Sequence, residues 1–213
     1  MRFLHLWEDG APNSSEFAER LRSWIHDASN PFADWYFGDR EAAGEIIGEW
    51  MERPSSELYL GRAIVMMDDQ EEPVGVLLGM SGAEVAACRM TDFTAFCEEI
   101  GSETEADEVV DQVVTASREL FPPIEEDAFY ISRIAIDPEK RGRGLGRQLV
   151  QHTIDLKRRQ GFERVRLDVS ADNADAIRAY ESLGFKVMSQ SQSTIAPLEY
   201  CAMLLEGIDR ADT

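Results

Sequence analysis

The chain has 213 residues, of which 44% are hydrophobic and 29% charged, a balance typical of a globular protein rather than of a disordered or collagen-like one. At this length one α/β domain, alone or with an insertion, can bury a core without disulfides, whereas two full domains would be cramped. The formal net charge of −20 argues against binding to nucleic acid or to an anionic membrane, and it favours cationic partners.

Targeting and metal-binding signals are missing from the sequence. No run approaches the roughly 18 apolar residues of a membrane-spanning helix. The first ten residues carry Glu8 and Asp9 and lack the basic start and long apolar run of a signal peptide, so we expect a cytoplasmic protein. The three cysteines and three histidines show no metal-ligand spacing, and we expect free thiols and no metal site. These residues are Cys88, Cys97, Cys201, His5, His26 and His152.

The first quarter of the chain predicts one strand and two helices. Phe3 to Trp7 is expected to be a strand. An amphipathic helix should follow, and a second helix is expected from about Arg40 to Glu52, stopping before Pro54. Between the helices, Asn30 to Asp39 is expected to be an aromatic-rich loop. The apolar face of the first helix consists of Phe17, Leu21, Trp24 and Ile25.

A hairpin and a helical segment are expected next. The apolar runs Ala63–Met67 and Val74–Met80 flank a polar stretch that ends in proline, which indicates an antiparallel hairpin. Residues 82–127 then predict an inserted segment of two helices. Its acidic side chains form either a solvated helix face or an acidic wall over a substrate site or a dimer contact. These acids are Glu98, Glu99, Glu103, Glu105, Asp107, Glu108 and Asp111.

The remaining elements alternate between strands and helices. Ala128 to Ile136 ends in a continuous apolar run, as a central strand does. A glycine-rich turn at Asp137 to Gly146 leads into a helix from Leu145 to about Gln160. Thereafter we expect a strand at Val165–Val169, a short helix at Asn173–Leu183, and strands at Phe185–Met188 and Leu198–Leu205. The order is that of a mixed α/β protein.

One segment of this acidic chain is strongly basic. Between Lys140 and Arg166 there are nine basic residues and only two acids. Lys157 to Arg159 are interpreted as a solvated helix face. Arg141, Arg143 and Arg147 instead alternate with glycines, and this pattern favours an anion site.

The glycine-rich turn matches one of three phosphate-binding patterns. A strand, a glycine-rich loop and a helix together point backbone N–H groups and a helix N-terminus at an anion. A Walker-type loop is excluded because the segment has no lysine followed by a hydroxyl residue, and a dinucleotide fingerprint is excluded because its third glycine falls on Arg147. The pattern R-x-x-G-x-G remains, formed by Arg141, Gly144 and Gly146.

Two motifs connect the chain with a known family. The first is ISRIAIDPEKRGRGLGRQLV at Ile131–Val150, and the second places Asn173, Ala176, Tyr180, Gly184 and Phe185 in the pattern N-x-x-A-x-x-x-Y-x-x-x-G-F. With these motifs the sequence resembles the GNAT superfamily of N-acetyltransferases. The resemblance implies an α/β acyl-CoA N-acyltransferase fold, whose central mixed, mostly antiparallel sheet is flanked by helices. It further implies a single domain over residues 1–213, with residues 128–188 as the acetyl-CoA-binding core. Residues 82–127, the acidic helical insertion, are longer than the usual connection at this place and are the main departure from the family pattern.

The resemblance assigns the cofactor contacts residue by residue. It implies that acetyl-CoA is the acyl donor and that its pantetheine arm pairs like an added strand with the backbone of Ile134, Ala135 and Ile136. Asn173 matches a position near this arm, and Arg143 and Arg147 reach either the 3′-phosphate or the solvent. The pyrophosphate would lie on the loop formed by Arg141, Gly142, Arg143, Gly144, Leu145 and Gly146, where the helix dipole and N–H groups attract it.

The chemistry needs an acid and a base. Tyr180 matches the family's general acid, which protonates the departing thiolate, although the same residue would also suit a core position. An alkyl amine with a pKa near 10.4 is neutral in only about one molecule in 10³ at pH 7, so a proton acceptor is needed. The family's strand positions for a base hold Tyr130 and Ser132, which are not strong bases. The base is left open between a water chain and a carboxylate, and the nearest acids in sequence are Glu125, Glu126 and Asp127.

The predicted activity is transfer of an acetyl group to a primary amine of a small cationic molecule or peptide, by direct attack in a ternary complex. By the same resemblance, the aromatic segment Phe32 to Phe37 borders the acceptor pocket, where it either stacks on a cationic amine or packs in the core. Two alternatives stay open. One is a catalytically weak acyl-CoA-binding module for a partner protein, and the other is a longer acyl donor or a hydroxyl acceptor. A homodimer is compatible with either reading.

Overall fold

The computed structural model describes residues 1–9, 15–37, 40–100 and 104–207, and its centre is a seven-stranded sheet. The strand order is β1-β2-β3-β4-β5-β7-β6; β4 and β5 run parallel, and the other neighbouring pairs are antiparallel. The expected fold class, a mixed and mostly antiparallel sheet flanked by helices, is confirmed. The strands are β1 (Arg2–His5), β2 (Ile64–Met67), β3 (Pro73–Ser81), β4 (Ala128–Ile136), β5 (Arg164–Ser170), β6 (Lys186–Gln192) and β7 (Glu199–Leu205).

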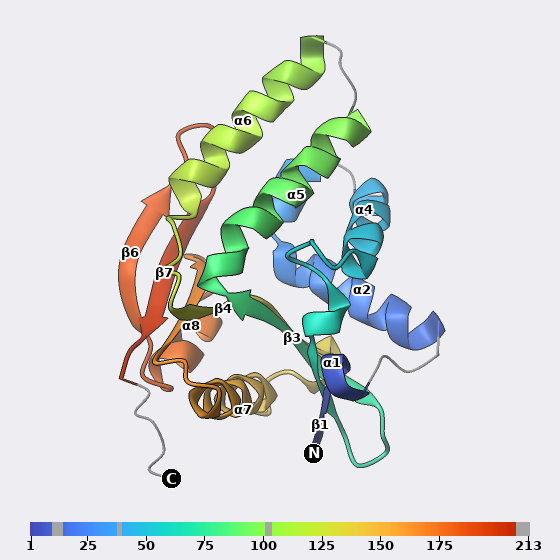
Figure 1. Ribbon diagram of the computed structural model, residues 1–213, viewed down its shortest axis with the longest axis vertical. Coiled ribbons are helices and arrows are strands. Elements are labelled where there is room, and N and C mark those ends of the chain that lie inside the picture. The colour runs from blue at the N-terminus through green and yellow to red at the C-terminus, as the bar shows by residue number, and fades with distance from the viewer. Residues whose placement is uncertain (10–14, 38–39, 101–103, 208–213) are drawn as a thin grey trace.

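Helices cover both faces of this sheet (Figure 1). On one face lie α2 (Ser15–Ser29) and α4 (Arg40–Glu52), and on the other lie α7 (Leu145–Arg159) and α8 (Ala174–Glu181). The side chains of β2 supply both layers, because successive residues of a strand point to opposite faces. Val65 packs toward α2 and α4, whereas Ile64 packs toward α7. The continuous apolar run of this strand therefore reflects burial on both sides.

The segment expected to be helical forms two long helices, α5 (Gly82–Ile100) and α6 (Thr104–Leu120), which lie side by side (Figure 1). Gly82 is the first residue of α5 and directly follows β3. It lies against Glu125, in the segment that leads back into β4. A Cβ atom at Gly82 would lie only 1.9 Å from the carbonyl oxygen of Glu125, so no larger residue fits without movement of the backbone. Glu108 and Asp111 are exposed, which matches the solvated-face interpretation, while Glu103 lies outside the described residues.

The structure corrects two expectations near the N-terminus. The strand predicted over Phe3–Trp7 ends at His5, and Leu6–Asp9 forms the short helix α1, in which Leu6 is buried while Trp7 points outward. The expected aromatic loop contains a helix, α3 (Phe32–Phe37). Its first turn is held by Asn30, whose Oδ1 accepts a hydrogen bond of 3.1 Å from the backbone N–H of Asp34.

The remaining sequence-based boundaries agree closely with the structure. Two short 3₁₀ turns, η1 (Leu60–Arg62) and η2 (Pro138–Lys140), connect the main elements. β6 runs past its expected end at Met188, because its antiparallel pairing with β7 continues to Gln192. In the described part of the chain no helix is long and apolar enough to cross a membrane, and no cluster of His, Cys, Asp or Glu has the form of a metal site. The cysteines are free thiols, as expected, with Cys97 only half-buried.

Candidate active site

The site is organised by a split between two parallel strands. β4 and β5 pair from Ala128↔Arg164 to Ile131↔Leu167, and their pairing stops there. β4 continues to Ile136 and stays paired with β3 on its other side. Within the described residues, the edge of Ile134, Ala135 and Ile136 that faces away from β3 has no strand partner. An extended ligand can add to such an edge as a further strand.

A bulge in β4 lies at the apex of the split. Leu78 of β3 pairs with Arg133 and Gly79 pairs with Ile131, which leaves Ser132 as an extra residue. A bulge changes the direction in which the following side chains point. As a result Tyr130, Ser132 and Arg133 all line the same side of the strand, facing the α2 and α5 layer.

The glycine-rich loop ends at the N-terminus of α7. Gly142 and Gly144 have φ angles of 76° and 74°, a left-handed conformation that favours glycine, and a Cβ atom on either would meet no atom within 4 Å. The first hydrogen bond across the N-terminus of α7 runs from the N–H of Gln148 to the carbonyl of Gly144. The preceding N–H groups of the helix are therefore free of intrahelical partners, and an anion can accept from them.

The side chains of this loop divide into two kinds. Leu145 is buried in the core beneath α7, and Arg141 donates from Nε to the carbonyl oxygen of Ile136 at 3.1 Å, so both hold the loop in place. Arg143 and Arg147 are exposed, and neither forms an ion pair within the described part of the chain. These two guanidinium groups are consequently available to an anion.

The residues of the second motif lie on α8. Asn173 caps this helix, because its Oδ1 accepts a 3.1 Å hydrogen bond from the N–H of Ala176. Tyr180 is 8% exposed and its ring lies 5.9 Å from that of Phe185, centroid to centroid. Burial raises the pKa of Tyr180 to about 12, and its hydroxyl hydrogen-bonds no other described residue. The phenol thus stays protonated at neutral pH.

A cavity of about 430 Å³ opens on the opposite side of β4 from α7. Its walls come from α2 to α6 and from β4, β5 and β7. It reaches the split at Ser132 and Asp168, the first residues of β4 and β5 beyond their last pair. Four residues of the predicted aromatic segment line it, three of them aromatic, whereas Tyr180 does not. Its aromatic wall consists of Phe32, Tyr36, Phe37, Trp50, Phe93, Phe121 and Tyr200.

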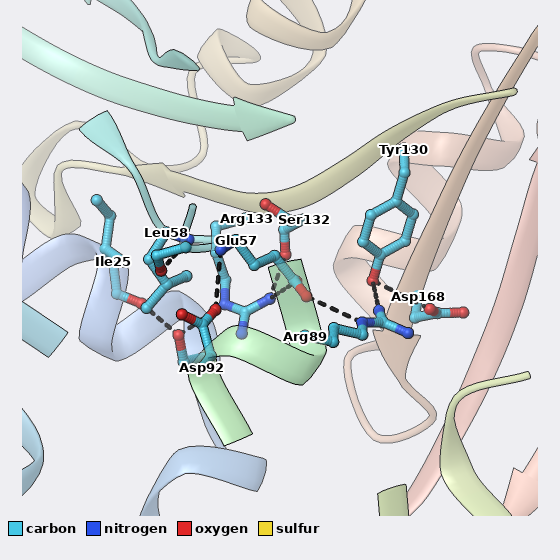
Figure 2. Close-up of polar contacts among 11 residues, drawn as sticks. Ile25, Glu57, Leu58, Arg89, Asp92, Tyr130, Ser132, Arg133 and Asp168 are labelled. Carbon is cyan, nitrogen blue, oxygen red and sulfur yellow. Dashed lines mark hydrogen bonds and ion pairs between the residues drawn. The ribbon is translucent and has the colours of Figure 1, made fainter. Parts of the chain in front are cut away.

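A chain of polar contacts crosses the floor of this cavity (Figure 2). Glu57 lies at its centre and binds two arginines: Arg89 Nε at 2.9 Å and Arg133 Nη1 at 3.2 Å. Arg89 Nη2 donates to the Tyr130 hydroxyl at 2.8 Å, and that hydroxyl donates to Asp168 Oδ2 at 3.1 Å. The network links α5, β4 and β5 to the segment between α4 and η1 that carries Glu57.

Burial and charge set the protonation of these groups. Burial alone would raise the pKa of Glu57, but Arg89 and Arg133 outweigh it and hold the pKa below its usual range, so Glu57 is ionised. Burial raises the pKa of Asp168, an effect that Arg166 and Arg89 only partly offset. Arg166 Nη1 contacts Asp168 Oδ1 at 2.8 Å.

Asp92 is the third carboxylate of the cavity, and one of its two oxygens has no hydrogen-bond partner. It is 7% exposed, and its Oδ2 accepts from the N–H of Glu57 at 2.8 Å. Its Oδ1 is buried without a hydrogen-bond partner, and so is the Oγ of Ser132. Burial raises the pKa of Asp92 to about 6. Buried polar atoms without partners are rare in proteins, and here two of them belong to residues that line one cavity.

Sequence reasoning missed the charged residues of the cavity. Glu125, Glu126 and Asp127, the nearest acids to the central strand in sequence, do not line it. The carboxylates that do are Glu57, Asp92 and Asp168, which come from separate parts of the chain. No local pattern in the sequence marks them, because only the packing of α5 against the sheet brings them together.

Comparison with known proteins agrees with this arrangement. Residues 3–185 match the model of the acetyltransferase (GNAT) family. The [ribosomal protein bS18]-alanine N-acetyltransferase of Escherichia coli K12 is 46% identical over 59 residues, which are 28% of this chain and 40% of that enzyme. The chain thus matches less than half the length of this curated relative.

Solved structures extend the likeness to the whole fold. An N-acetyltransferase from Staphylococcus aureus Mu50 superposes with a TM-score of 0.66 at 13% identity, covering 96% of this chain and 100% of that one. A putative acetyltransferase from Salmonella typhimurium, solved with its cofactor acetyl-CoA, gives a TM-score of 0.55 at 18% identity and covers 100% of this chain and 96% of that one. The acyltransferase fold implied by the sequence motifs is confirmed.

Proposed function

The chain belongs to the acetyltransferase (GNAT) family, and from this premise we propose that it is an N-acetyltransferase that moves an acetyl group from acetyl-CoA to a primary amine. The observation that carries the proposal is the position of the split between β4 and β5. The glycine-rich loop lies on one side of it, and a cavity with buried carboxylates reaches it from the other. We further propose that residues 82–127 are an insertion in a single domain and that residues 128–188 form the acetyl-CoA-binding core.

Acetyl-CoA would lie along the free edge of β4. The backbone of Ile134 to Ile136 would pair with the pantetheine arm, and the N–H groups from Arg141 to Gly146 would bind the pyrophosphate. Arg143 and Arg147 would reach the 3′-phosphate. Asn173, whose Oδ1 already caps α8, would approach the arm through its remaining polar atoms.

The reaction needs one bond to form and one to break in a ternary complex. The amine nitrogen attacks the thioester carbonyl carbon, the C–S bond then breaks, and the thiolate takes a proton from the Tyr180 hydroxyl. Asp92 accepts the proton that the amine loses, because its Oδ1 has no other partner while Glu57 and Asp168 are held by arginines. Direct attack requires no covalent acetyl-enzyme.

The carboxylates of the cavity also bear on the rival hypothesis. Two features favour a catalytically weak binding module: the lack of a base at Tyr130 and Ser132, and the large acidic insertion at residues 82–127. Asp92 provides a base from α5 instead, so the transferase is the better-supported reading. The net charge of −20 favours acceptors that approach as ammonium ions, in a protein we place in the cytoplasm without nucleic-acid or membrane partners.

The decisive experiment measures acetyl-CoA binding by calorimetry for the wild type and for Gly144→Glu. A carboxylate at this position should block and repel the pyrophosphate, and we expect micromolar affinity to be abolished. Gly161→Glu is the matched control, since Gly161 also has a positive φ, 92°, and open space around its Cβ position, but lies beyond the other end of α7. This variant should bind as the wild type does. Absence of wild-type binding at both low and high salt would overturn the proposal.

A further inference from the structure

The charge of the cavity differs from that of the protein. The chain has 41 acidic residues against 21 Lys and Arg, yet the cavity lining holds three of each kind. A further arginine that does not line the cavity, Arg166, forms an ion pair with Asp168. A purely cationic acceptor would therefore be drawn to the protein surface but would meet arginines inside. The carboxylates are Glu57, Asp92 and Asp168, and the arginines are Arg89, Arg118 and Arg133.

Two of these arginines retain unused hydrogen-bond donors. Arg89 engages Nε and Nη2, and Arg133 engages Nε with Ser29 at 2.7 Å and Nη1 with Glu57 and the carbonyl of Ser132. Nη1 of Arg89 and Nη2 of Arg133 hydrogen-bond no other described residue. Both side chains keep some exposure, 31% and 23%, and both line the cavity.

Glu57 holds the two guanidinium groups next to each other. One carboxylate binds both, through different oxygens, so the pair carries one positive charge more than its shared partner neutralises. Adjacent guanidinium groups with free N–H donors match the geometry of a carboxylate, which accepts hydrogen bonds at both oxygens.

The other features of the cavity describe the rest of a ligand. The unpartnered Oδ1 of Asp92 can accept from an amine, and the aromatic wall suits an apolar body. On this basis, which rests on the proposed function, we propose that the acceptor is an amino acid with an apolar side chain. Arg89 and Arg133 bind its carboxylate, and its amine receives the acetyl group.

A pair of reaction products tests this subsite without requiring turnover. N-acetyl-L-phenylalanine and N-(2-phenylethyl)acetamide share the ring and the acetylated nitrogen and differ in the carboxylate. We expect the first to bind about tenfold to a hundredfold more tightly, measured by calorimetry in the presence of CoA, because hydrogen bonds to charged groups give gains of that order. Equal affinities, or binding of neither compound, would overturn the assignment.

Two variants assign the effect to the arginines. Arg89→Gln and Arg133→Gln each leave Glu57 one arginine partner, and each should bring the affinity ratio of the two products close to one. The ratio is measured on a single protein sample, so partial unfolding would weaken both ligands and leave it unchanged. The control is Arg2→Gln, since Arg2 is exposed and pairs with Glu71 away from the cavity. A wild-type ratio in both cavity variants would contradict the inference.

Release of CoA separates this inference from the transferase reaction itself. The assay offers phenylalanine and phenethylamine as acceptors with acetyl-CoA. If phenethylamine is acetylated at least as efficiently as phenylalanine, the transferase stands and the amino-acid acceptor is wrong. If neither is acetylated while N-acetyl-L-phenylalanine keeps its binding advantage, the carboxylate subsite stands and acetyl transfer to this amine is wrong.

Discussion

Asp92 shows at the scale of a single residue how a buried carboxylate can weaken a fold. Its pKa of about 6 exceeds the ordinary value of 3.8, so the native state binds more protons than the unfolded state between these pH values. The free energy of unfolding therefore falls as pH rises through this window, and the full penalty persists above about pH 6. A buried carboxylate whose pKa lies close to neutral pH is suited to accept a proton.

Asp92→Asn should stabilise the protein at pH 8 by about 2–3 kcal/mol, because it removes a buried charge and keeps an acceptor for the N–H of Glu57. At pH 4 the gain should nearly vanish. Thermal unfolding at the two pH values measures the difference, with Asp69→Asn as an exposed control. Asp92→Asn should also lower kcat, because the amide cannot accept the proton of the amine. A gain in stability that does not depend on pH would contradict the raised pKa.

Tyr180→Phe tests the acid. General acid catalysis contributes about 10²-fold or more, so we expect kcat to fall by about 10² with little change in the KM for acetyl-CoA. Tyr130→Phe is the informative comparison, because the Tyr130 hydroxyl lies in the cavity but directs its proton to Asp168. Steady-state kinetics of both variants decides between them. A larger fall in Tyr130→Phe would move the acid role to Tyr130.

At the scale of elements, the site depends on how α5 leaves the sheet. Arg89 and Asp92 lie near the middle of this helix, and Phe93, the next residue, belongs to the aromatic wall. The helix starts at Gly82, where the chain passes so close to Glu125 that a side chain would collide with the backbone. This junction fixes the direction of α5 and thereby the position of the polar network over β4.

Gly82→Ala should consequently destabilise the protein by about 1–3 kcal/mol, since the added methyl group can be placed only by moving the backbone. Gly44→Ala provides the opposite case. It lies within α4 with no atom within 4 Å of its Cβ position, and alanine there should stabilise by about 0.5–1 kcal/mol. Urea denaturation measures both. Wild-type stability in Gly82→Ala would show that the junction adjusts freely.

At the scale of the whole molecule, the net charge of −20 opposes compactness through self-repulsion. Acetyl-CoA is itself an anion and would approach this protein at its glycine-rich loop, where Arg143 and Arg147 are exposed and form no ion pair within the described part of the chain. Salt therefore acts in opposite directions on folding and on cofactor binding, because it screens the repulsion in one case and the attraction in the other.

Raising NaCl from about 0.02 M to about 0.5 M should raise Tm and weaken acetyl-CoA binding, since the Debye length shrinks from tens of ångströms to a few. Differential scanning calorimetry and titration calorimetry measure the two trends on one preparation. A Tm that falls with salt would mean that exposed ion pairs such as Arg2–Glu71 outweigh the repulsion.

Elements with local signals could be predicted from the amino-acid sequence. The apolar run of β4, the glycines of the loop and the apolar spacing of α7 all lie in one continuous stretch, residues 128–159. Each of these elements forms for a reason that its own few residues carry, so a local pattern predicts it. The short helix α3 was not predicted, because its start depends on a hydrogen bond from the N–H of Asp34 to Asn30 Oδ1, a capping contact that lies in an aromatic-rich segment. The end of β1 was likewise overestimated, since apolar Trp7 points outward.

The polar network of the cavity could not be predicted from the sequence, because it depends on how distant segments pack. Two features of the packing bring the charged residues of the cavity together: α5 packs over β4, and β4 and β5 separate beyond Ile131. These residues include Glu57, Asp92, Arg133 and Asp168. A carboxylate in a sequence looks the same whether it will be solvated or buried between two arginines. Its protonation and its partners follow from burial and from charges brought together across long stretches of chain, which no local pattern encodes.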